Sequence, residues 1–309
     1  MIDFRYHVVS VVAIFLALAA GIALGSGPLQ AQLTETLTDQ AASDRLGEQQ
    51  ARTDLDVAQA RLAFADDFAG TTSSAVVGSA LADRTVSIAV LPGADRGHVR
   101  ALRTEIAAAE GSVVSTIILT PELLDPANRQ LAGGLAQRVL KRGGSGRSEG
   151  AGSYRLLGAA VARSYLTKSD GRVERGHDAV GIEAALAEAD LIAVSGNAAR
   201  RAQLALVVAG EPEPDAPDGQ DAVAAEIATA LDAGSAGAVV AGPSAAGDEG
   251  VVSAIRGSAA DATVSSVDAL DLPAGRIVTV LALAEQALGG VGQYGVGDAA
   301  DSAAPKIAR

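Results

Sequence analysis

The chain has 309 residues, of which 49% are hydrophobic and only 3% aromatic, so a sizeable core must be built from small aliphatic side chains. Its net charge of −13 disfavours nucleic-acid binding, because an acidic surface repels a phosphate backbone. The absence of cysteine excludes disulfides, a thiolate nucleophile and zinc-finger spacing, and it leaves the cellular compartment open. Abundant Gly and Ala fit either tight packing of helices on a sheet or a GC-rich genome.

An uncharged, almost wholly apolar segment follows the leader MIDFRYH, residues 1–7. It runs from Val8 to Leu24, and no charged residue lies between position 8 and position 30. About 20 helical residues cross a hydrocarbon core of about 30 Å. We therefore predict a transmembrane helix over residues 8–29. The alternatives are a signal peptide cleaved near Ala23 and a buried helix of a soluble core; the length of the segment and the weakly basic leader favour retention.

Small residues recur at every fourth position of this segment, at Ala17, Gly21 and Gly25. This spacing places them on one face of a helix, and the small-xxx-small pattern allows two membrane helices to approach closely. The pattern predicts a membrane helix packing face. Its alternative is the general abundance of Gly and Ala in the chain.

Charge on the two sides of the segment predicts its orientation. Arg5 and the terminal amine precede it, whereas the first charges after it are acidic, beginning with Glu35. By the positive-inside rule the leader is expected in the cytoplasm and the C-terminal domain outside it. The predicted localisation is thus a single-pass protein of the cell membrane or envelope, in contact with membrane lipid.

Residues 30–70 contain no proline and read as one helical stalk. Ala51, Leu55, Ala58, Leu62 and Ala65 alternate by four and three, the spacing of a coiled-coil seam. Charged residues occupy two earlier seam positions and weaken that half. The stalk is expected to pair with a second copy, giving a homo-oligomer, or to pack on its own domain.

Beyond the stalk, short apolar runs alternate with helical stretches, which is typical of a mostly parallel sheet covered on both faces. We predict a three-layer α/β domain over residues 76–297. Strands are expected at 85–91, 113–119, 191–194, 204–209, 238–241 and 264–267, and helices at 95–110, 121–141 and 222–231; residues 276–288 fit strand, helix or both.

Two loops and a tail interrupt this pattern. Residues 141–153 are rich in Gly and Ser, residues 211–219 are acidic and rich in Pro, and both are expected to face solvent. Residues 298–309 are expected to form a disordered tail.

The loops expected at the carboxyl ends of strands are the usual place for a ligand in an open α/β sheet. They are residues 91–95, 195–197 and 241–244. None has the glycine pattern of a dinucleotide-binding or P-loop motif, so nucleotide binding is not indicated and no cofactor is predicted.

Catalytic chemistry is not indicated either. The chain has no nucleophile elbow of the form G-x-S-x-G and only three histidines, His7, His98 and His177. His177 precedes Asp178, an adjacency that resembles a His–carboxylate pair but is more typical of a surface turn. The sequence therefore predicts a protein without enzymatic activity.

Metal ligands are equally sparse. Copper(I) prefers sulfur ligands, and this chain offers no Cys and only Met1. The acidic loop carries Glu211, Glu213, Asp215 and Asp218, which attract divalent cations loosely or simply keep the loop solvated. Metal-ligating residues are left unassigned.

Two segments at the ends of the chain are distinctive together: the N-terminus MIDFRYHVVSVVAIFLALAAGIALGSGPL and residues 273–297, PAGRIVTVLALAEQALGGVGQYGVG. These two segments resemble the mycobacterial copper-transporter family called MctB. The resemblance implies an envelope protein that exports copper and contributes to copper resistance, with a proposed outer-membrane pore. No copper ligand of the family can be carried to a numbered position.

The residues themselves support the envelope location but not a pore. A transmembrane barrel needs many alternating segments of about ten residues, whereas residues 76–297 predict a parallel sheet. Two hypotheses follow. The first is an oligomeric envelope transporter for copper; the second is a membrane-anchored scaffold that binds an envelope or cell-division protein through its stalk or α/β domain.

Overall fold

The computed structural model describes residues 4–25, 28–142, 152–169, 173–195 and 198–306. The chain divides into two compact units, Met1–Ala65 and Asp66–Arg309. The first unit consists of helix α1 (Phe4–Gly25) and most of helix α2 (Pro28–Val77), and the second contains the end of α2 and all later elements. Most of the predicted Gly/Ser-rich loop, residues 143–151, lies outside the described residues.

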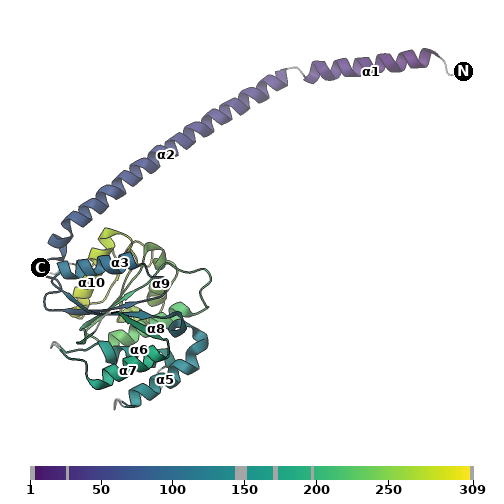
Figure 1. Ribbon diagram of the computed structural model, residues 1–309. Coiled ribbons are helices and arrows are strands. Elements are labelled where there is room, and N and C mark those ends of the chain that lie inside the picture. The colour runs from purple at the N-terminus through teal and green to yellow at the C-terminus, as the bar shows by residue number, and fades with distance from the viewer. Residues whose placement is uncertain (1–3, 26–27, 143–151, 170–172, 196–197, 307–309) are drawn as a thin grey trace. The chain divides into compact units, whose positions relative to one another are not determined.

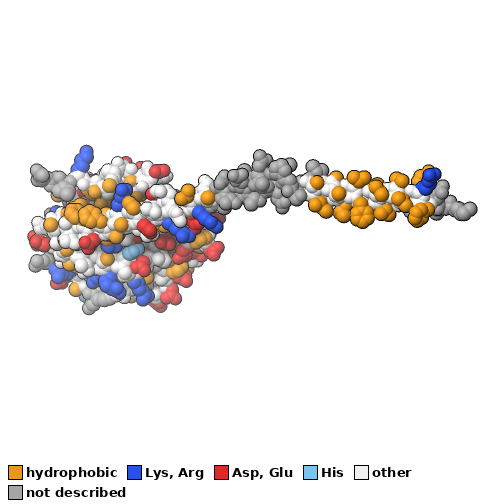
Figure 2. All heavy atoms as spheres, turned by 90° about the horizontal axis from the view of Figure 1, so that it is seen from above, with side chains coloured by type: hydrophobic (Ala, Val, Ile, Leu, Met, Phe, Trp, Pro, Cys, Tyr) orange, Lys and Arg blue, Asp and Glu red, His pale blue; other side chains and the backbone are white. Residues whose placement is uncertain are grey.

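Helix α1 is one candidate membrane span. Its residues Phe4–Ala23 are long and apolar enough to cross a bilayer, and none of this segment is buried inside the protein. On the face seen in Figure 2, hydrophobic side chains cover most of the helix. Large side chains such as Phe15 and Leu16 are about two-thirds exposed, at 66% and 65%. A helix that is apolar all round requires an apolar environment, and a bilayer provides one.

Helix α2 has 50 residues, a length of about 75 Å at the usual helical rise. The predicted seam residues Leu55 and Leu62 are 56% and 59% exposed. Within the second unit, Val77 at the end of the helix is buried and the Ser73 hydroxyl donates to the Glu105 carboxylate. The stalk is therefore one continuous helix, whereas the coiled coil stays a prediction.

Seven strands among the described residues form a single sheet in the order β3-β2-β1-β4-β5-β6-β7. Every neighbouring pair is parallel except β2 and β3, which are antiparallel. The strands are β1 (Thr85–Val90), β2 (Ser112–Leu119), β3 (Ile192–Ser195), β4 (Leu204–Val208), β5 (Ala238–Ala241), β6 (Ser265–Val267) and β7 (Gln293–Tyr294). The near-continuous apolar runs of β4 and β5 are buried throughout, as a central parallel sheet requires.

Helices cover both faces of this sheet, which confirms the predicted α/β class (Figure 1). Leu102 and Ile106 of α3 pack with α10 on one face, and the other core contains residues of the helices that follow β2 and β4. The helices are α3 (Arg96–Ala108), α4 (Pro121–Leu124), α5 (Arg129–Arg142), α6 (Ser153–Tyr165), α7 (His177–Glu188), α8 (Gln220–Ala233), α9 (Val251–Arg256) and α10 (Pro273–Ala287).

Three segments differ from the sequence-based expectation. The ambiguous stretch 276–288 belongs to a helix, whose start has Pro273 in its first turn, where the missing N–H costs nothing. The helix expected over 121–141 is divided at Pro126, since proline cannot continue the hydrogen-bond ladder of α4. Within residues 298–306, for which the sequence predicts disorder, Asp301 and Ser302 pair with β7: the Asp301 N–H donates to the Gln293 carbonyl over 2.7 Å.

The motif GQYG, residues 292–295, closes around a buried ion pair that we call the C-terminal clasp. Asp268 is 0% exposed and accepts a 2.6 Å hydrogen bond from Nη1 of Arg256. The same carboxylate accepts the backbone N–H groups of Val296 and Gly297, over 2.6 and 3.1 Å. Gly295 has a φ of +138°, and a Cβ there would overlap the Asp268 carboxylate. The clasp therefore depends on glycine and on a fully hydrogen-bonded charge.

Candidate functional site

The direction in which the chain leaves each strand defines one special position in the sheet. From β1 the chain moves to β2 on one side, and from β4 it moves to β5 on the other, although β1 and β4 are neighbours. Their connections diverge, and a crevice forms outside the carboxyl ends of two such strands. This is the position at which ligands bind in open α/β sheets.

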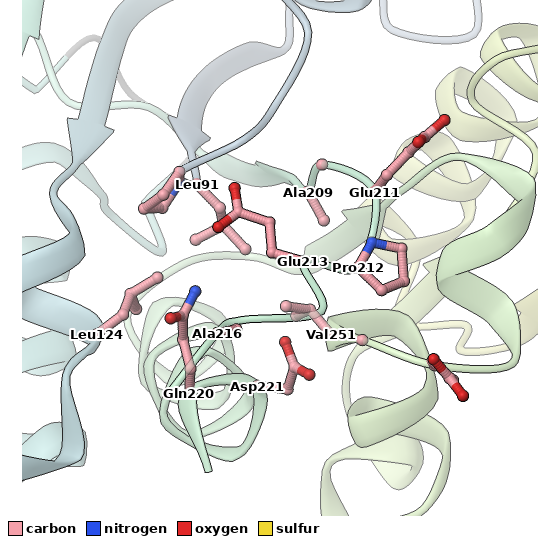
Figure 3. A pocket seen from close by; sticks show the side chains of 14 residues that line it. Leu91, Leu124, Ala209, Glu211, Pro212, Glu213, Ala216, Gln220, Asp221 and Val251 are labelled. Atoms are coloured by element: carbon pink, nitrogen blue, oxygen red, sulfur yellow. The ribbon is translucent and has the colours of Figure 1, made fainter. Parts of the chain in front are cut away.

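A pocket of about 140 Å³ lies at this position. It combines the ends of β1 and β4 with the acidic loop and the starts of α8 and α9 (Figure 3). We call it the switch-point pocket. Its lining residues are Leu91, Pro92, Leu124, Ala209, Gly210, Glu211, Pro212, Glu213, Ala216, Gln220, Asp221, Glu249, Gly250 and Val251.

Two glycines bring the connecting loops together beside the pocket. A Cβ at Gly210 would lie against the backbone of Gly93, so the loops after β4 and β1 touch through their main chains. Gly93 has a φ of +74°, and a Cβ there would lie 2.7 Å from Oε1 of Glu213. The Glu213 carboxylate therefore lies close to the loop that follows β1, and Figure 3 shows it near Leu91.

The lining includes four carboxylates, Glu211, Glu213, Asp221 and Glu249, and no Lys or Arg. None of the four has an ion pair or a hydrogen bond within the described part of the chain. Burial raises the pKa of Asp221 above its ordinary value of 3.8, because desolvation disfavours the charged carboxylate. In Figure 3 the side chains of Glu213, Gln220 and Asp221 point toward the middle of the pocket.

This arrangement can attract cations but does not form a preorganised metal centre. Unpaired carboxylates near a low-dielectric wall give a negative potential that raises the local concentration of cations. Across residues 4–25, 28–142, 152–169, 173–195 and 198–306, however, no group of three or more His, Cys, Asp or Glu side chains is placed to hold a metal ion. The pocket's lining also contains no sulfur ligand for copper(I).

The structure brings together half of the acidic residues that the sequence singled out. Glu211 and Glu213 line the pocket, whereas Asp215 and Asp218 of the same loop do not. Sequence reasoning missed Asp221, which lies in the first turn of α8 directly after this loop. The sequence signal for Asp221 is an acidic residue at the start of a helix. This signal does not identify a pocket residue, because an acidic residue there equally well complements the helix dipole.

One of the three strand-end loops was placed at the wrong edge. The expectation assumed that residues 195–197 follow a parallel strand, but β3 is antiparallel to β2, so its carboxyl end lies at the opposite edge of the sheet. Residues 196 and 197 lie outside the described part. In the loop after β5, Ser244 is engaged structurally, since its N–H and hydroxyl donate to Asp271 over 2.8 and 2.9 Å.

The histidines of the second unit occupy helix starts. The backbone N–H of His98 donates to the N-capping Asp95 carboxylate over 3.0 Å, and these hydrogen bonds lower the pKa of Asp95. His177 begins α7, and the next residue, Asp178, lies 3.6 Å from an Arg163 guanidinium nitrogen. The Asp178 carboxylate is thus engaged with an arginine.

The predicted membrane helix packing residues, Ala17, Gly21 and Gly25, all lie in α1. A Cβ added at Gly21 or Gly25 would meet no other atom within 4 Å. Their packing role stays a prediction, because it requires a second helix.

Together, the apolar helix α1, the long helix α2 and the α/β unit define a membrane-associated protein with one candidate span. A model of the family "Copper transport outer membrane protein, MctB" matches residues 1–305, and the chain belongs to this family. It is 30% identical over 316 aligned residues to "Copper transporter MctB" of Mycobacterium tuberculosis strain H37Rv, with 98% of each chain covered. The protein of the same name from Mycobacterium leprae is 28% identical over 312 aligned residues, again with 98% of each covered.

Proposed function

We propose that this protein takes part in copper efflux through the cell envelope and thereby contributes to copper resistance. The observation that carries the proposal is the family match over residues 1–305, together with relatives named as copper transporters that align over 98% of the chain. Copper is the cargo in this proposal, and no resident cofactor is involved.

We further propose that α1 holds the protein in the membrane and that the α/β unit lies outside the cytoplasm. The apolar surface of α1 supports the first part, and Arg5, in the first turn of α1 at the N-terminal end of the span, supports the orientation. Protease added to spheroplasts, whose cytoplasmic membrane is intact, is expected to digest the α/β unit while the membrane fraction retains α1. Recovery of a soluble protein without residues 1–25 would contradict retention.

A single span encloses no path for an ion, so transport by this chain requires several copies. We propose association through the Gly21–Gly25 face of α1 and the seam of α2. The chain has no cysteine, so a single introduced cysteine reports pairing directly. Leu62→Cys is expected to form a disulfide-linked dimer in membranes under mild oxidation.

Ala60→Cys is the matched control, because residue 60 lies near the opposite face of α2 from the seam. Equal crosslinking at positions 60 and 62 would contradict the proposed seam. Adding Gly21→Ile to the Leu62→Cys variant is expected to reduce the dimer yield, since a branched side chain prevents close helix approach.

The decisive experiment for function is a deletion strain grown in rising copper. Deletion is expected to increase copper sensitivity and cell-associated copper, and the full-length chain is expected to restore both. Leu16→Asp, which places a charge at the centre of α1, is expected to fail in restoring them because it costs about 3 kcal/mol of insertion free energy. Unchanged copper content in the deletion strain would contradict the efflux proposal.

A second candidate function is a membrane-anchored scaffold for an envelope or cell-division protein. The exposed aliphatic seam of α2 favours it, as does the lack of a metal-holding cluster in the described residues. Affinity purification of the full-length protein from membranes is expected to return a stoichiometric second protein in this case. Purification that returns only this chain would contradict it.

A further inference from the structure

Positive charge is concentrated in one part of this acidic protein. Residues 129–201 carry 12 of the 24 Lys and Arg residues but only 7 of the 37 Asp and Glu residues, a net charge of +5 within a chain of −13. This segment forms α5, α6 and α7, which lie together on one side of the sheet (Figure 1). An anionic ligand repelled by the rest of the surface is attracted here.

Three arginines of this segment converge near the start of α7. Arg163 on α6 lies 3.6 Å from the Asp178 carboxylate of the first turn of α7. Arg201 is held beside the same region, because its backbone N–H donates to the Val173 carbonyl over 2.9 Å. Helix α7 begins at His177, and its N-cap residue Gly176 supplies no side-chain cap, so the first N–H groups add to the positive potential.

Arg175 is the fixed part of this cluster. Its Nε and Nη1 donate to the carbonyls of Ser164 and Ala198 over 2.9 and 3.0 Å, and its Nη2 pairs with the Glu183 carboxylate. Its guanidinium also lies 4.5 Å from the centre of the Tyr165 ring. All three guanidinium nitrogens of Arg175 therefore already have protein acceptors, and Arg175 fixes the segment that carries the other two arginines.

Arg201 is the opposite case. Its Nε is buried and has no hydrogen-bond partner among the described residues. Burial and the nearby charges of Arg163 and Arg175 lower the pKa of the Arg201 guanidinium. A buried donor without an acceptor costs roughly 1–3 kcal/mol, so the protein alone does not satisfy the Arg201 guanidinium.

We propose that Arg163, Arg201 and the start of α7 form a binding site for a phosphate group, with Asp178 occupying part of it in the free protein. A guanidinium presents N–H donors in a planar fork that matches phosphate oxygens, which is why arginine suits this ligand. At 3.6 Å the Asp178 contact with Arg163 is loose, and its side chain is 62% exposed, so a phosphate can displace it. The source is either free phosphate or the phosphodiester of a lipid headgroup, two ligands of the same chemistry.

The test is isothermal titration calorimetry of the full-length protein in nonionic detergent at low ionic strength, with inorganic phosphate and with glycerophosphoglycerol, a soluble lipid headgroup. Arg201→Gln is expected to weaken binding by about tenfold or more, because it removes a charge-assisted donor. Asp178→Asn is expected to strengthen binding severalfold, because it removes the competing carboxylate.

Arg155→Gln is the matched control, since Arg155 is an exposed arginine of the same positive segment, and its effect is expected to stay within about twofold. Tighter binding of the diester would identify a lipid headgroup as the ligand, and tighter binding of inorganic phosphate would identify free phosphate. The proposal is overturned if neither binds, or if the three variants change the affinity equally. Near-ultraviolet circular dichroism of each variant checks folding, and the gain expected for Asp178→Asn cannot arise from unfolding.

Discussion

The C-terminal clasp and the switch-point pocket place aspartates in opposite situations. In the clasp, Asp268 is 0% exposed and its two oxygens accept hydrogen bonds from Arg256 and from two backbone N–H groups. In the pocket, Asp221 is partly buried beside three glutamates and has no partner in the described residues. Both carboxylates are at least partly removed from water, but only Asp268 has protein hydrogen-bond donors in place of the lost water.

This difference separates a charge that stabilises the fold from a charge that is available to a ligand. A desolvated carboxylate with a full set of donors has no remaining capacity, and removing it strands its partners. A carboxylate with a raised pKa and no donors costs stability, which is typical of functional sites. Removing the charge of Asp268 is therefore expected to lower the free energy of unfolding, whereas removing the charge of Asp221 is expected to raise it.

The largest effect is expected for Asp268→Ala. The substitution leaves the Arg256 guanidinium, whose side chain is 4% exposed, as a buried charge without its counter-ion. It also strands the N–H groups of Val296 and Gly297. Breaking a buried ion pair in this way costs about 3–5 kcal/mol. Urea unfolding of the full-length protein in detergent, followed through its tyrosines, measures the loss.

Asp248→Asn is the control for this measurement, because Asp248 is an exposed acid of the same region and its replacement is expected to change stability by no more than about 0.5 kcal/mol. A loss for Asp268→Ala in that same small range would show that the clasp is not a stabilising unit.

A smaller loss of stability is expected for Gly295→Ala, which perturbs the clasp without altering any charge. The φ of +138° disfavours alanine, and its Cβ would overlap the Asp268 carboxylate, so the loop must move and weaken its hydrogen bonds. We expect a cost above about 1 kcal/mol but below that of Asp268→Ala. Gly289→Ala is a useful comparison, because it shares a positive φ, +83°, but has no atom within 4 Å of the added Cβ. Equal losses in the two variants would assign the effect to backbone strain alone.

The local parts of this molecule follow from its sequence. The apolar strands β1, β4 and β5 and the membrane-length helix α1 were predicted because each is encoded in a continuous run of residues. The α/β class follows from the alternation of such runs with helical segments. Strand direction does not: β3 enters the sheet after α4, α5, α6 and α7, and its antiparallel placement depends on how those helices pack.

The sites are less predictable, because they join distant residues. Asp268 meets Arg256 from twelve positions earlier and Val296 from twenty-eight positions later. The switch-point pocket joins Leu91 with residues beyond position 200, so only its contiguous acidic loop could be read from the sequence. The site at Arg201 could not be predicted from the sequence either, because its residues are distant in the chain and do not form a basic run.

The smallest effect, and the only gain in stability, is expected for Asp221→Asn. Burial raises the pKa of Asp221 in the folded protein above 3.8, so the folded state binds its proton more tightly than the unfolded state does. The penalty is absent when both states are protonated at low pH, and it develops as the pH rises past 3.8 and through the higher folded pKa. At pH 7 the Asp221→Asn variant is therefore expected to be more stable than the unsubstituted protein by less than about 1 kcal/mol, because the carboxylate is still partly hydrated.

Urea titrations at pH 7 and near pH 4 measure this difference in stability, which is expected to shrink at the lower pH. Asp218→Asn, in the exposed part of the same loop, is expected to change nothing at either pH. A loss of stability in Asp221→Asn at pH 7 would mean that the carboxylate already has a stabilising partner, and the contrast with Asp268 would no longer hold.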